Sequence, residues 1–353
     1  MNSIFSNQSL PALNSEWFVA SASTDHQIAS SIDRSRILGK PTVHLVLDRW
    51  SQMIVGSHVS LEEGFQLGCL LAFENALAEK VSFCRNLGIG ISDADYPCHH
   101  ICESLLLGFT PNEWLLNSLL EFGVHVKSPN SRQLAQNAKI EASLGHVILS
   151  LGSCGASDRQ LNGILYLKQF RRLLVQYILH YNNHQKLEPY LIDEQTDQHS
   201  GLVPIDLWNW GLHSSSNSLR AAPSERQRLN LLPKATASIT SRGIAFQGLY
   251  YTCGTAINEQ WFTRARVGVR SKVTLAYDPR CVDVVYLIAA NGDEPEVCHL
   301  TPQYRPMLGQ SWFEARSYLA DIKERTQHTH DKFKLAVEEI VHESIKRNES
   351  LDL

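Results

Sequence analysis

The sequence lacks the features that mark membrane and secreted proteins. No stretch reaches the roughly 18 consecutive apolar residues of a membrane-spanning helix, and the N-terminus has neither a basic start nor a long apolar run. The eight cysteines form no repeated C-x-x-C pair, so without a signal peptide they are expected to be reduced thiols. These absences predict a cytoplasmic protein that contacts no membrane.

A charge excess and the common catalytic motifs are missing as well. The formal net charge is −4 over 353 residues, so only a local patch of charge could indicate nucleic-acid binding. The sequence contains no P-loop, no G-x-G-x-x-G after a strand, no H-E-x-x-H and no recognisable nucleophile triad.

The hydrophobic pattern predicts an α/β domain followed by a small β-barrel. Apolar, β-branched runs at 43–47 and 53–59 predict a hairpin of strands, and apolar residues at helical spacing predict helices over 62–88 and 161–184. From Leu231 the hydrophobic period becomes two. About five or six short strands with regular turns and no helix between them favour a barrel.

The predicted organisation has five parts. They are a loose N-terminus (1–16), the α/β core (17–185), a connector rich in Ser, Asn, Pro and Gln (186–230), the β-barrel (231–305) and a C-terminal helical region (306–353), helical over 311–347. Within the core, a short helix and then a strand are expected in 112–129, and another helix in 137–151.

One crowded cluster of possible metal ligands lies in PCHHICES. Cys98, His99, His100 and Cys102 are close in sequence, but a structural zinc site usually combines one such pair with a second pair many residues away. No second pair is visible. A turn before a helix, with polar caps, explains these residues better, so we predict no bound metal and no other cofactor.

A basic strand is predicted in TRARVGVRSKVTL (263–275). Arg264, Arg266, Arg270 and Lys272 alternate with Ala265, Val267, Val269 and Val273, which on a strand would separate a cationic face from a buried apolar face. From 233 to 281 there are seven Lys or Arg and two acids, so the local net charge is 7 − 2 = +5. Together with Arg242, these four cations are predicted to contact the DNA backbone.

The stretch GKPTVHLVLDRWSQMIVGSHVSLE (39–62) resembles the catalytic-core segment of TnsB-type transposases, relatives of the phage Mu transposase. RLNLLPKATASITSRGIAFQGLYYTC (228–253) resembles the start of that family's barrel. Further similar stretches follow the same order, at 78–107, 174–190, 204–212 and 276–287. The resemblance covers roughly 17–320 and implies an RNase H-like (integrase-type) core, then a β-barrel, then helices.

Members of that family cut transposon ends and join them to target DNA with three acids that hold two divalent metal ions, normally Mg²⁺. The resemblance puts the three acid positions at Ser21, Gly108 and Glu141 in this sequence. Two of the three are not acids, and a hydroxyl and a glycine cannot replace carboxylate ligands of Mg²⁺. The resemblance therefore implies a degenerate catalytic triad and no strand transfer.

Three functions remain as alternatives. The first is an inactive TnsB-like homologue that binds DNA, an active transposase subunit or an AAA+ ATPase partner. The second is an active transposase with relocated acids, drawn from Asp25, Asp95 or Glu103, and Glu141. The third is a decayed fragment. Family members carry DNA-reading domains ahead of the core, and residues 1–16 are too short to form one.

Overall fold

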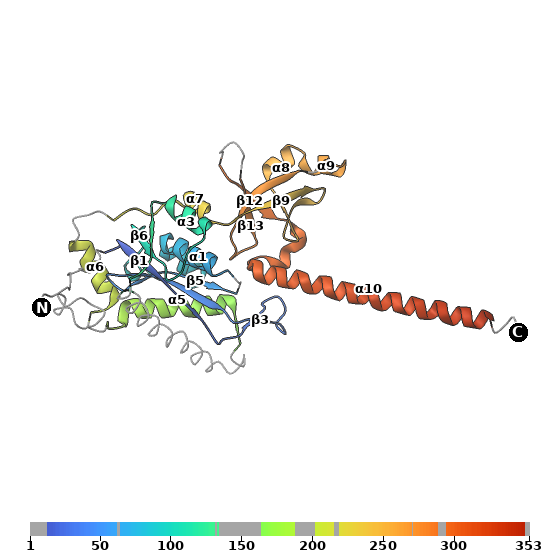
Figure 1. The fold of residues 1–353 in the computed structure, drawn as a ribbon, viewed down its shortest axis with the longest axis horizontal. Helices are drawn as coiled ribbons and strands as arrows, with labels where there is room; N and C mark the ends of the chain where they lie inside the picture. The colour runs from blue at the N-terminus through green and yellow to red at the C-terminus, as the bar shows by residue number, and fades with distance from the viewer. Residues whose placement is uncertain are drawn as a thin grey trace. The chain divides into compact units, whose positions relative to one another are not determined.

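The computed structural model of the protein divides into two compact units, residues 1–233 and 234–353 (Figure 1). The described residues are 13–61, 64–130, 133, 164–187, 202–214, 219–269, 271–288 and 294–349; of 329–331 and 335–349 only the backbone is described. The predicted connector thus falls in the first unit, while the barrel and the C-terminal helix make the second.

A five-stranded mixed sheet forms the centre of the first unit. Its order is β5-β4-β1-β6-β7, with β1 (Glu16–Ser23), β4 (Thr42–Asp48), β5 (Ile54–Ser60), β6 (Ser104–Leu106) and β7 (His125–Lys127). Strands β1, β4 and β5 are antiparallel, which confirms the predicted hairpin, whereas β1, β6 and β7 are parallel.

Helices and short strands surround this sheet. They are β2 (Ile28–Ala29), β3 (Ile37–Gly39), α1 (Phe65–Leu77), α2 (Lys80–Asn86), η1 (Asp93–Asp95), α3 (Glu113–Leu120), β8 (Leu165–Tyr166), α5 (Leu167–His184), α6 (Pro204–Ser214), α7 (Glu225–Arg228) and η5 (Leu229–Leu231). The helix and strand predicted in 112–129 are confirmed as α3 and β7. The helix predicted in 137–151 lies outside the described residues.

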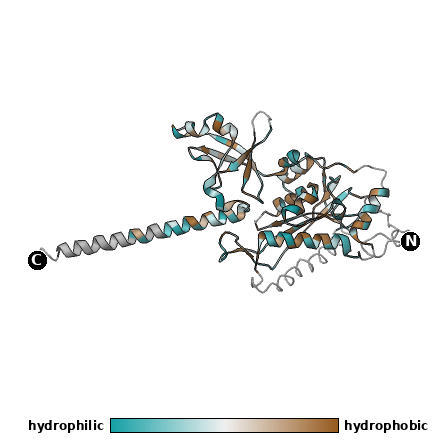
Figure 2. Cartoon of the chain, turned by 180° about the vertical axis from the view of Figure 1, so that it is seen from behind, coloured by the Kyte–Doolittle hydropathy of each residue, from teal (hydrophilic) through white to brown (hydrophobic). Residues whose placement is uncertain are grey.

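Helix α5 confirms most of the helix predicted over 161–184. It has an apolar side and a polar side, visible as brown and teal bands along the helix (Figure 2). Asn182 in its last turn is fully buried, and its side-chain amide exchanges two 3.0 Å hydrogen bonds with the backbone of Ile54 on β5. A buried amide satisfied in this way fixes the helix against the sheet edge.

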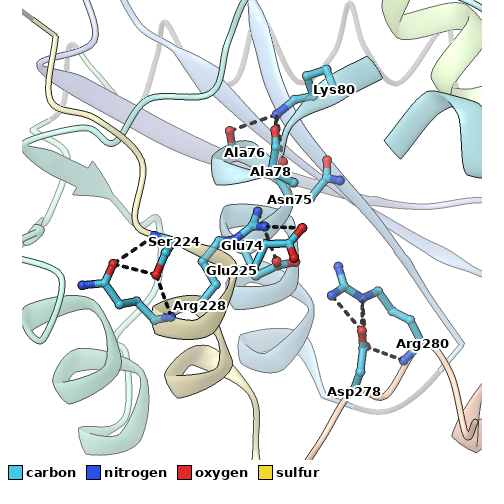
Figure 3. Close-up of polar contacts among 11 residues, drawn as sticks. Glu74, Asn75, Ala76, Ala78, Lys80, Ser224, Glu225, Arg228, Asp278 and Arg280 are labelled. Carbon is cyan, nitrogen blue, oxygen red and sulfur yellow. Dashed lines mark hydrogen bonds and ion pairs between the residues drawn. The ribbon is translucent and has the colours of Figure 1, made fainter. Parts of the chain in front are cut away.

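The single helix predicted over 62–88 is wrong, because the chain breaks at Ala78 into α1 and α2. Glu79 accepts hydrogen bonds from the backbone N–H groups of Val81 and Ser82 at 2.8 and 2.7 Å, so it caps a new helix. The buried Lys80 donates to the carbonyls of Asn75, Ala76 and Ala78, at 2.8 to 2.9 Å (Figure 3). One cation therefore closes the end of α1, where a helix exposes unpaired carbonyls.

Residues 13–16, expected to be loose, are packed into the core. Leu13 and Asn14 are buried, and the Asn14 N–H donates to Asp48 Oδ1 at 2.8 Å. Glu16 is buried in an ion pair with Arg49 and lies 3.4 Å from Lys127 Nζ. These contacts tie the chain ahead of β1 to the turn between β4 and β5.

The second unit confirms the predicted barrel, with six strands. The closed order is β10-β11-β14-β13-β12-β9, formed by β9 (Lys234–Thr240), β10 (Gly243–Phe246), β11 (Leu249–Thr252), β12 (Lys272–Tyr277), β13 (Val284–Ile288) and β14 (Glu296–Leu300). The expectation of no helix between the strands is wrong, because α8 (Gly254–Asn258) and α9 (Trp261–Arg266) separate β11 from β12.

The predicted basic strand is wrong for the same reason. Arg264 and Arg266 lie in the last turn of α9, and Val267 and Val269 are 78% and 52% exposed rather than buried. Gly268, at φ +96°, ends the helix: its N–H donates to Ala265 O, and the Val269 N–H donates to Arg264 O. This is a Schellman end, which requires a residue with positive φ.

A long helix follows the barrel. After the short η6 (Pro302–Met307), α10 runs over Trp312–Glu349, which confirms the helix predicted over 311–347. Trp312 is buried and packs edge-on against Phe246 and Tyr277, with ring centroids 4.9 and 5.6 Å away. Among the described residues, no helix has the length and apolar character needed to cross a membrane.

Replacing Lys80 with Met tests its part in closing α1. Because three carbonyls would lose a charged donor inside the core, the free energy of unfolding should fall by about 2–4 kcal/mol. Urea denaturation measures it. Lys40→Met is the matched control: Lys40 makes an exposed ion pair with Asp25, so its loss should cost less than about 1 kcal/mol. Equal effects of the two variants would contradict the capping role.

Candidate functional site

Strands β1 and β6 bring two of the three expected acid positions together. Their parallel register pairs Phe18 with Leu106, so its continuation places Ala20 level with Gly108 and puts Ser21 one residue further along. Both positions therefore lie at the carboxyl-end edge of two adjacent parallel strands. Glu141 lies outside the described residues, as does Arg270 of the predicted DNA contacts.

The Ser21 side chain is engaged by its neighbour on β4. Ser21 pairs across the sheet with His44, and its Oγ lies 2.8 Å from His44 Nδ1. The same nitrogen lies 3.7 Å from the Sγ of Cys69 on α1. The imidazole therefore fills the space between the sheet and α1.

Gly68 makes room for that imidazole. A Cβ on this residue would overlap Nε2 of His44, so the ring packs directly against the backbone of α1. By contrast, a Cβ at Gly108 would meet no atom within 4 Å. The space at position 108 is open, whereas the space beside position 21 is filled.

The rings of Phe65 and His58 contact the imidazole. Phe65, in the first turn of α1, packs edge-on against His44 with 5.4 Å between ring centroids, and Phe109 packs on Phe65 at 4.8 Å. His58 on β5 stacks with His44, with 6.3 Å between ring centroids. We call the group of Ser21, His44, Phe65, Cys69 and Phe109 the neutral plug.

Burial keeps this group uncharged. Desolvation lowers the pKa of His44 to about 4 and raises the pKa of Cys69 to about 12, so neither carries charge at neutral pH. No carboxylate belongs to the plug. Among the described residues, no three His, Cys, Asp or Glu side chains are grouped to hold a metal ion.

The acids suggested as relocated ligands lie apart. Asp25 is exposed beyond the end of β1, where a 2.8 Å hydrogen bond to Lys40 lowers its pKa. Glu103 precedes Ser104, which pairs with Glu16 at the opposite end of β1. Seven strand steps of about 3.3 Å separate those ends, so Asp25 and Glu103 are roughly 20 Å or more apart. Two metal ligands cannot be that distant.

Asp95 is engaged locally. Its carboxylate accepts hydrogen bonds from the backbone N–H and the hydroxyl of Ser92, both at 2.7 Å, and these bonds lower its pKa. The group caps the short helix η1. Its contacts explain it as a turn residue.

The PCHH segment is a packed turn. Cys98 is buried, and its thiol donates to the carbonyl of Val55 at 3.4 Å; burial raises its pKa to about 11. Cys102 is also buried, and His99 and His100 stack on each other at 4.8 Å. The two thiols lie in the hydrophobic core, but the helix expected after this turn is wrong, because strand β6 follows it.

The barrel cations divide into occupied and unoccupied groups. Arg264 donates to the carbonyl of Glu259, and Arg280 makes an ion pair with Asp278 at 2.8 Å (Figure 3). Arg242, Arg266 and Lys272 are exposed and form no ion pair with the other described residues. Among the described DNA contacts predicted from the sequence, these three are therefore the ones open to a ligand.

Some residues of this site carried no usable signal in the sequence. His44 stands alone among apolar strand residues, and nothing in the sequence connects it to Gly68 or Phe109. The helical end at Gly268 did have a signal, because a glycine after basic residues is a common helix stop. The alternation of Arg and Val nevertheless favours a strand over 263–275, whereas the structure forms α9 over Trp261–Arg266.

Comparisons with known proteins match both units. The family described as TnsB C-terminal domain matches residues 20–147, and the family described as Mu transposase, C-terminal, matches residues 228–299. The transposon Tn7 transposition protein TnsB of Escherichia coli is 30% identical over 313 residues, which cover 84% of this chain and 44% of that protein. The chain thus spans less than half the length of this relative.

One solved structure has a low similarity score. It is a cryo-EM structure of a simian T-cell lymphotropic virus intasome with the PP2A regulatory subunit B56 gamma, with a TM-score of 0.32, 9% identity and coverage of 86% of this chain and 83% of that one. The two family matches and the 30% identity to TnsB together support a TnsB- and Mu-type transposase family for this chain.

Gly68→Ala tests the packing of the plug. The new methyl group would overlap the His44 ring against a fixed helix backbone, so the free energy of unfolding should fall by about 1–3 kcal/mol. Gly90→Ala is the matched control, because a Cβ there meets nothing within 4 Å. Thermal melting of both variants checks this. The addition of His44→Ala should recover part of the loss, and no recovery would argue against the contact.

The lowered pKa of His44 predicts a pH dependence. A histidine whose folded pKa is about 4 instead of 6.5 stabilises the fold above pH 6.5, and this contribution is lost as the pH falls toward 4. Between pH 7 and pH 5 the protein should lose about 2 kcal/mol from this group. His44→Gln should remove that part of the pH dependence. Urea titrations at both pH values measure it, and parallel curves for the two proteins would contradict a buried neutral imidazole.

Proposed function

We propose that this protein is a catalytically inactive TnsB-like transposase homologue that acts in DNA transposition by binding DNA, transposition partners, or both. In this proposal the first unit is an RNase H-like core without its metal-binding acids. The observation that carries it is the neutral plug, which occupies the space beside Ser21 where the family resemblance expects a metal-binding aspartate.

The chemistry of the plug supports inactivity. Metal-assisted strand transfer needs carboxylates that hold divalent cations and stabilise the attacking and leaving oxygens. Position 21 offers a hydroxyl bonded to a neutral imidazole, and position 108 offers no side chain. Even with Glu141 in place, a single acid would not hold two ions.

The alternatives have less support. Relocated acids would have to act together, but Asp25 and Glu103 lie at opposite ends of β1. A decayed fragment should accumulate polar groups in its interior. Instead, two fully buried polar side chains of the first unit have partners: Asp48 accepts hydrogen bonds from Asn14 and Ser51, and Asn182 pairs with Ile54.

DNA contact is assigned to the barrel. The exposed cations Arg242, Arg266 and Lys272 lie in a segment with few acids, and DNA affinity of this kind comes mainly from phosphate neutralisation. Partner contact is assigned to α10, whose residues from Lys323 to His328 are exposed. An active transposase subunit or an AAA+ ATPase would be the partner there.

A strand-transfer assay tests the inactivity. With transposon-end DNA, target DNA and Mg²⁺ or Mn²⁺, the protein should give no joined product, while an active TnsB-type transposase on its own ends serves as the positive control. Product from this protein would contradict the proposal. If Ala at Asp25, Glu103 or Glu141 then abolished that product, the relocated-acid alternative would replace it.

DNA binding is tested by fluorescence anisotropy across a salt series. Arg266→Ala with Lys272→Ala should weaken binding to any duplex and lower the salt slope by about 2, since each phosphate contact contributes about 0.9. Lys323→Ala with Lys334→Ala, two exposed cations of α10, is the charge-matched control. If both double variants lost affinity equally, binding would depend on net charge and not on the barrel.

A further inference from the structure

Arg242 differs from the other barrel cations in how it is held. Its guanidinium carbon lies 4.7 Å from the ring centre of Tyr250, over the ring face. Tyr304 stacks on Tyr250 with 6.2 Å between centroids and 18° between planes. The described residues thus place one arginine on a pair of stacked tyrosines.

The backbone around these side chains is tightly fixed. Arg242 occupies the turn between β9 and β10, where its N–H donates to Thr240 Oγ1 at 3.2 Å. The next residue, Gly243, has φ +138°, and a Cβ there would lie 2.9 Å from the carbonyl of Tyr251 and 3.3 Å from the Cβ of Tyr250. The turn therefore presses onto β11, and only glycine fits this close approach.

Tyr304 is held independently. Its hydroxyl donates to the carbonyl of Gly248 at 3.2 Å, and the Thr301 N–H donates to the carbonyl of Tyr250 at 2.9 Å. The start of η6 is thereby attached to β11, which supports the stack from the side of the chain that leads to α10.

The guanidinium of Arg242 keeps its hydrogen-bonding capacity. It donates no hydrogen bond and makes no ion pair within the described residues. By contrast, Arg264 donates to the carbonyl of Glu259, and Arg280 pairs with Asp278. Stacking uses the face of a guanidinium and leaves its N–H edge free. A planar, fixed edge with several donors matches the oxygens of a phosphate group.

We propose that Arg242 is a preorganised phosphate contact of the barrel and that Tyr250, supported by Tyr304, is its positioning residue. The ligand is a backbone phosphate of DNA, so this inference rests on the proposed DNA binding by the barrel. A mobile lysine must lose side-chain freedom when it binds, and the stacked arginine has already lost it.

The test measures the affinity of the full chain for a labelled duplex by anisotropy at several salt concentrations. Arg242→Ala should weaken binding about 5- to 10-fold and lower the salt slope by about 1. Arg242→Lys should keep the slope but recover only part of the affinity, because an ammonium cannot stack as a plane. Lys234→Ala, an exposed barrel cation at the start of β9, is the control and should cost about 2-fold or less.

A double-mutant cycle isolates the role of Tyr250. Tyr250→Leu should weaken binding about 3-fold with little change in slope, and Tyr250→Phe should bind normally because the ring remains. In the Arg242→Ala background, Tyr250→Leu should have no further effect. If Tyr250→Leu does not fold, the comparison of Arg242→Lys with Arg242→Ala decides, and equal affinities there would overturn the proposal.

The outcomes separate this inference from the proposed function. If the unchanged protein binds no DNA, the proposed DNA binding fails and the phosphate contact fails with it. If the protein binds DNA but Arg242→Ala matches Lys234→Ala, only the preorganised contact is overturned. Losses that differ between GC-rich and AT-rich duplexes would indicate base reading by Arg242 and would also overturn it. If millimolar inorganic phosphate displaced the duplex while the salt slope of duplex binding stayed the same, the ligand of Arg242 would be a free anion and not DNA.

Discussion

The candidate site of the first unit depends on how β1 pairs with its two neighbouring strands. On one side the antiparallel pairing with β4 sets Ser21 opposite His44, and on the other the parallel pairing with β6 sets Gly108 at the same edge. A shift of one residue would turn Ser21 to the opposite face of the sheet. The register is held at the start of β1 by Asn14, Glu16 and their partners around Asp48 and Arg49.

Asp48 shows the cost of that anchor. The carboxylate is fully buried, and burial raises its pKa to about 6 even though the N–H of Asn14 and the N–H and hydroxyl of Ser51 all donate to it. Through these hydrogen bonds Asp48 joins the segment ahead of β1 to the turn between β4 and β5, two parts of the chain that are far apart in sequence. Hydrogen bonds connect them where apolar packing alone would leave the turn unspecified.

Patterns that repeat along the chain were readable from the sequence, and features that depend on distant residues were not. The hairpin of β4 and β5, the barrel strands, α5 and α10 follow from periodicity. The break at Ala78 depends on Lys80 reaching back to three carbonyls, and the plug depends on His44 meeting Gly68, so neither leaves a local pattern. The resemblance directed attention to Ser21 and Gly108, but it did not reveal what surrounds them. The segment 263–275 was misread because Arg and Val alternate there while Gly268 ends a helix.

The close packing of His44 on Gly68 makes positions 21, 44 and 68 interdependent. An aspartate at position 21 alone would face a neutral imidazole with no room to withdraw, so the carboxylate would gain a histidine partner and not a metal ion. A metal-binding edge at this place would require His44 and Gly108 to be changed together with Ser21. The local packing therefore resists single changes: an acid introduced at any one of positions 21, 44 and 68 meets neighbours packed against the present residue, so several substitutions would have to occur together.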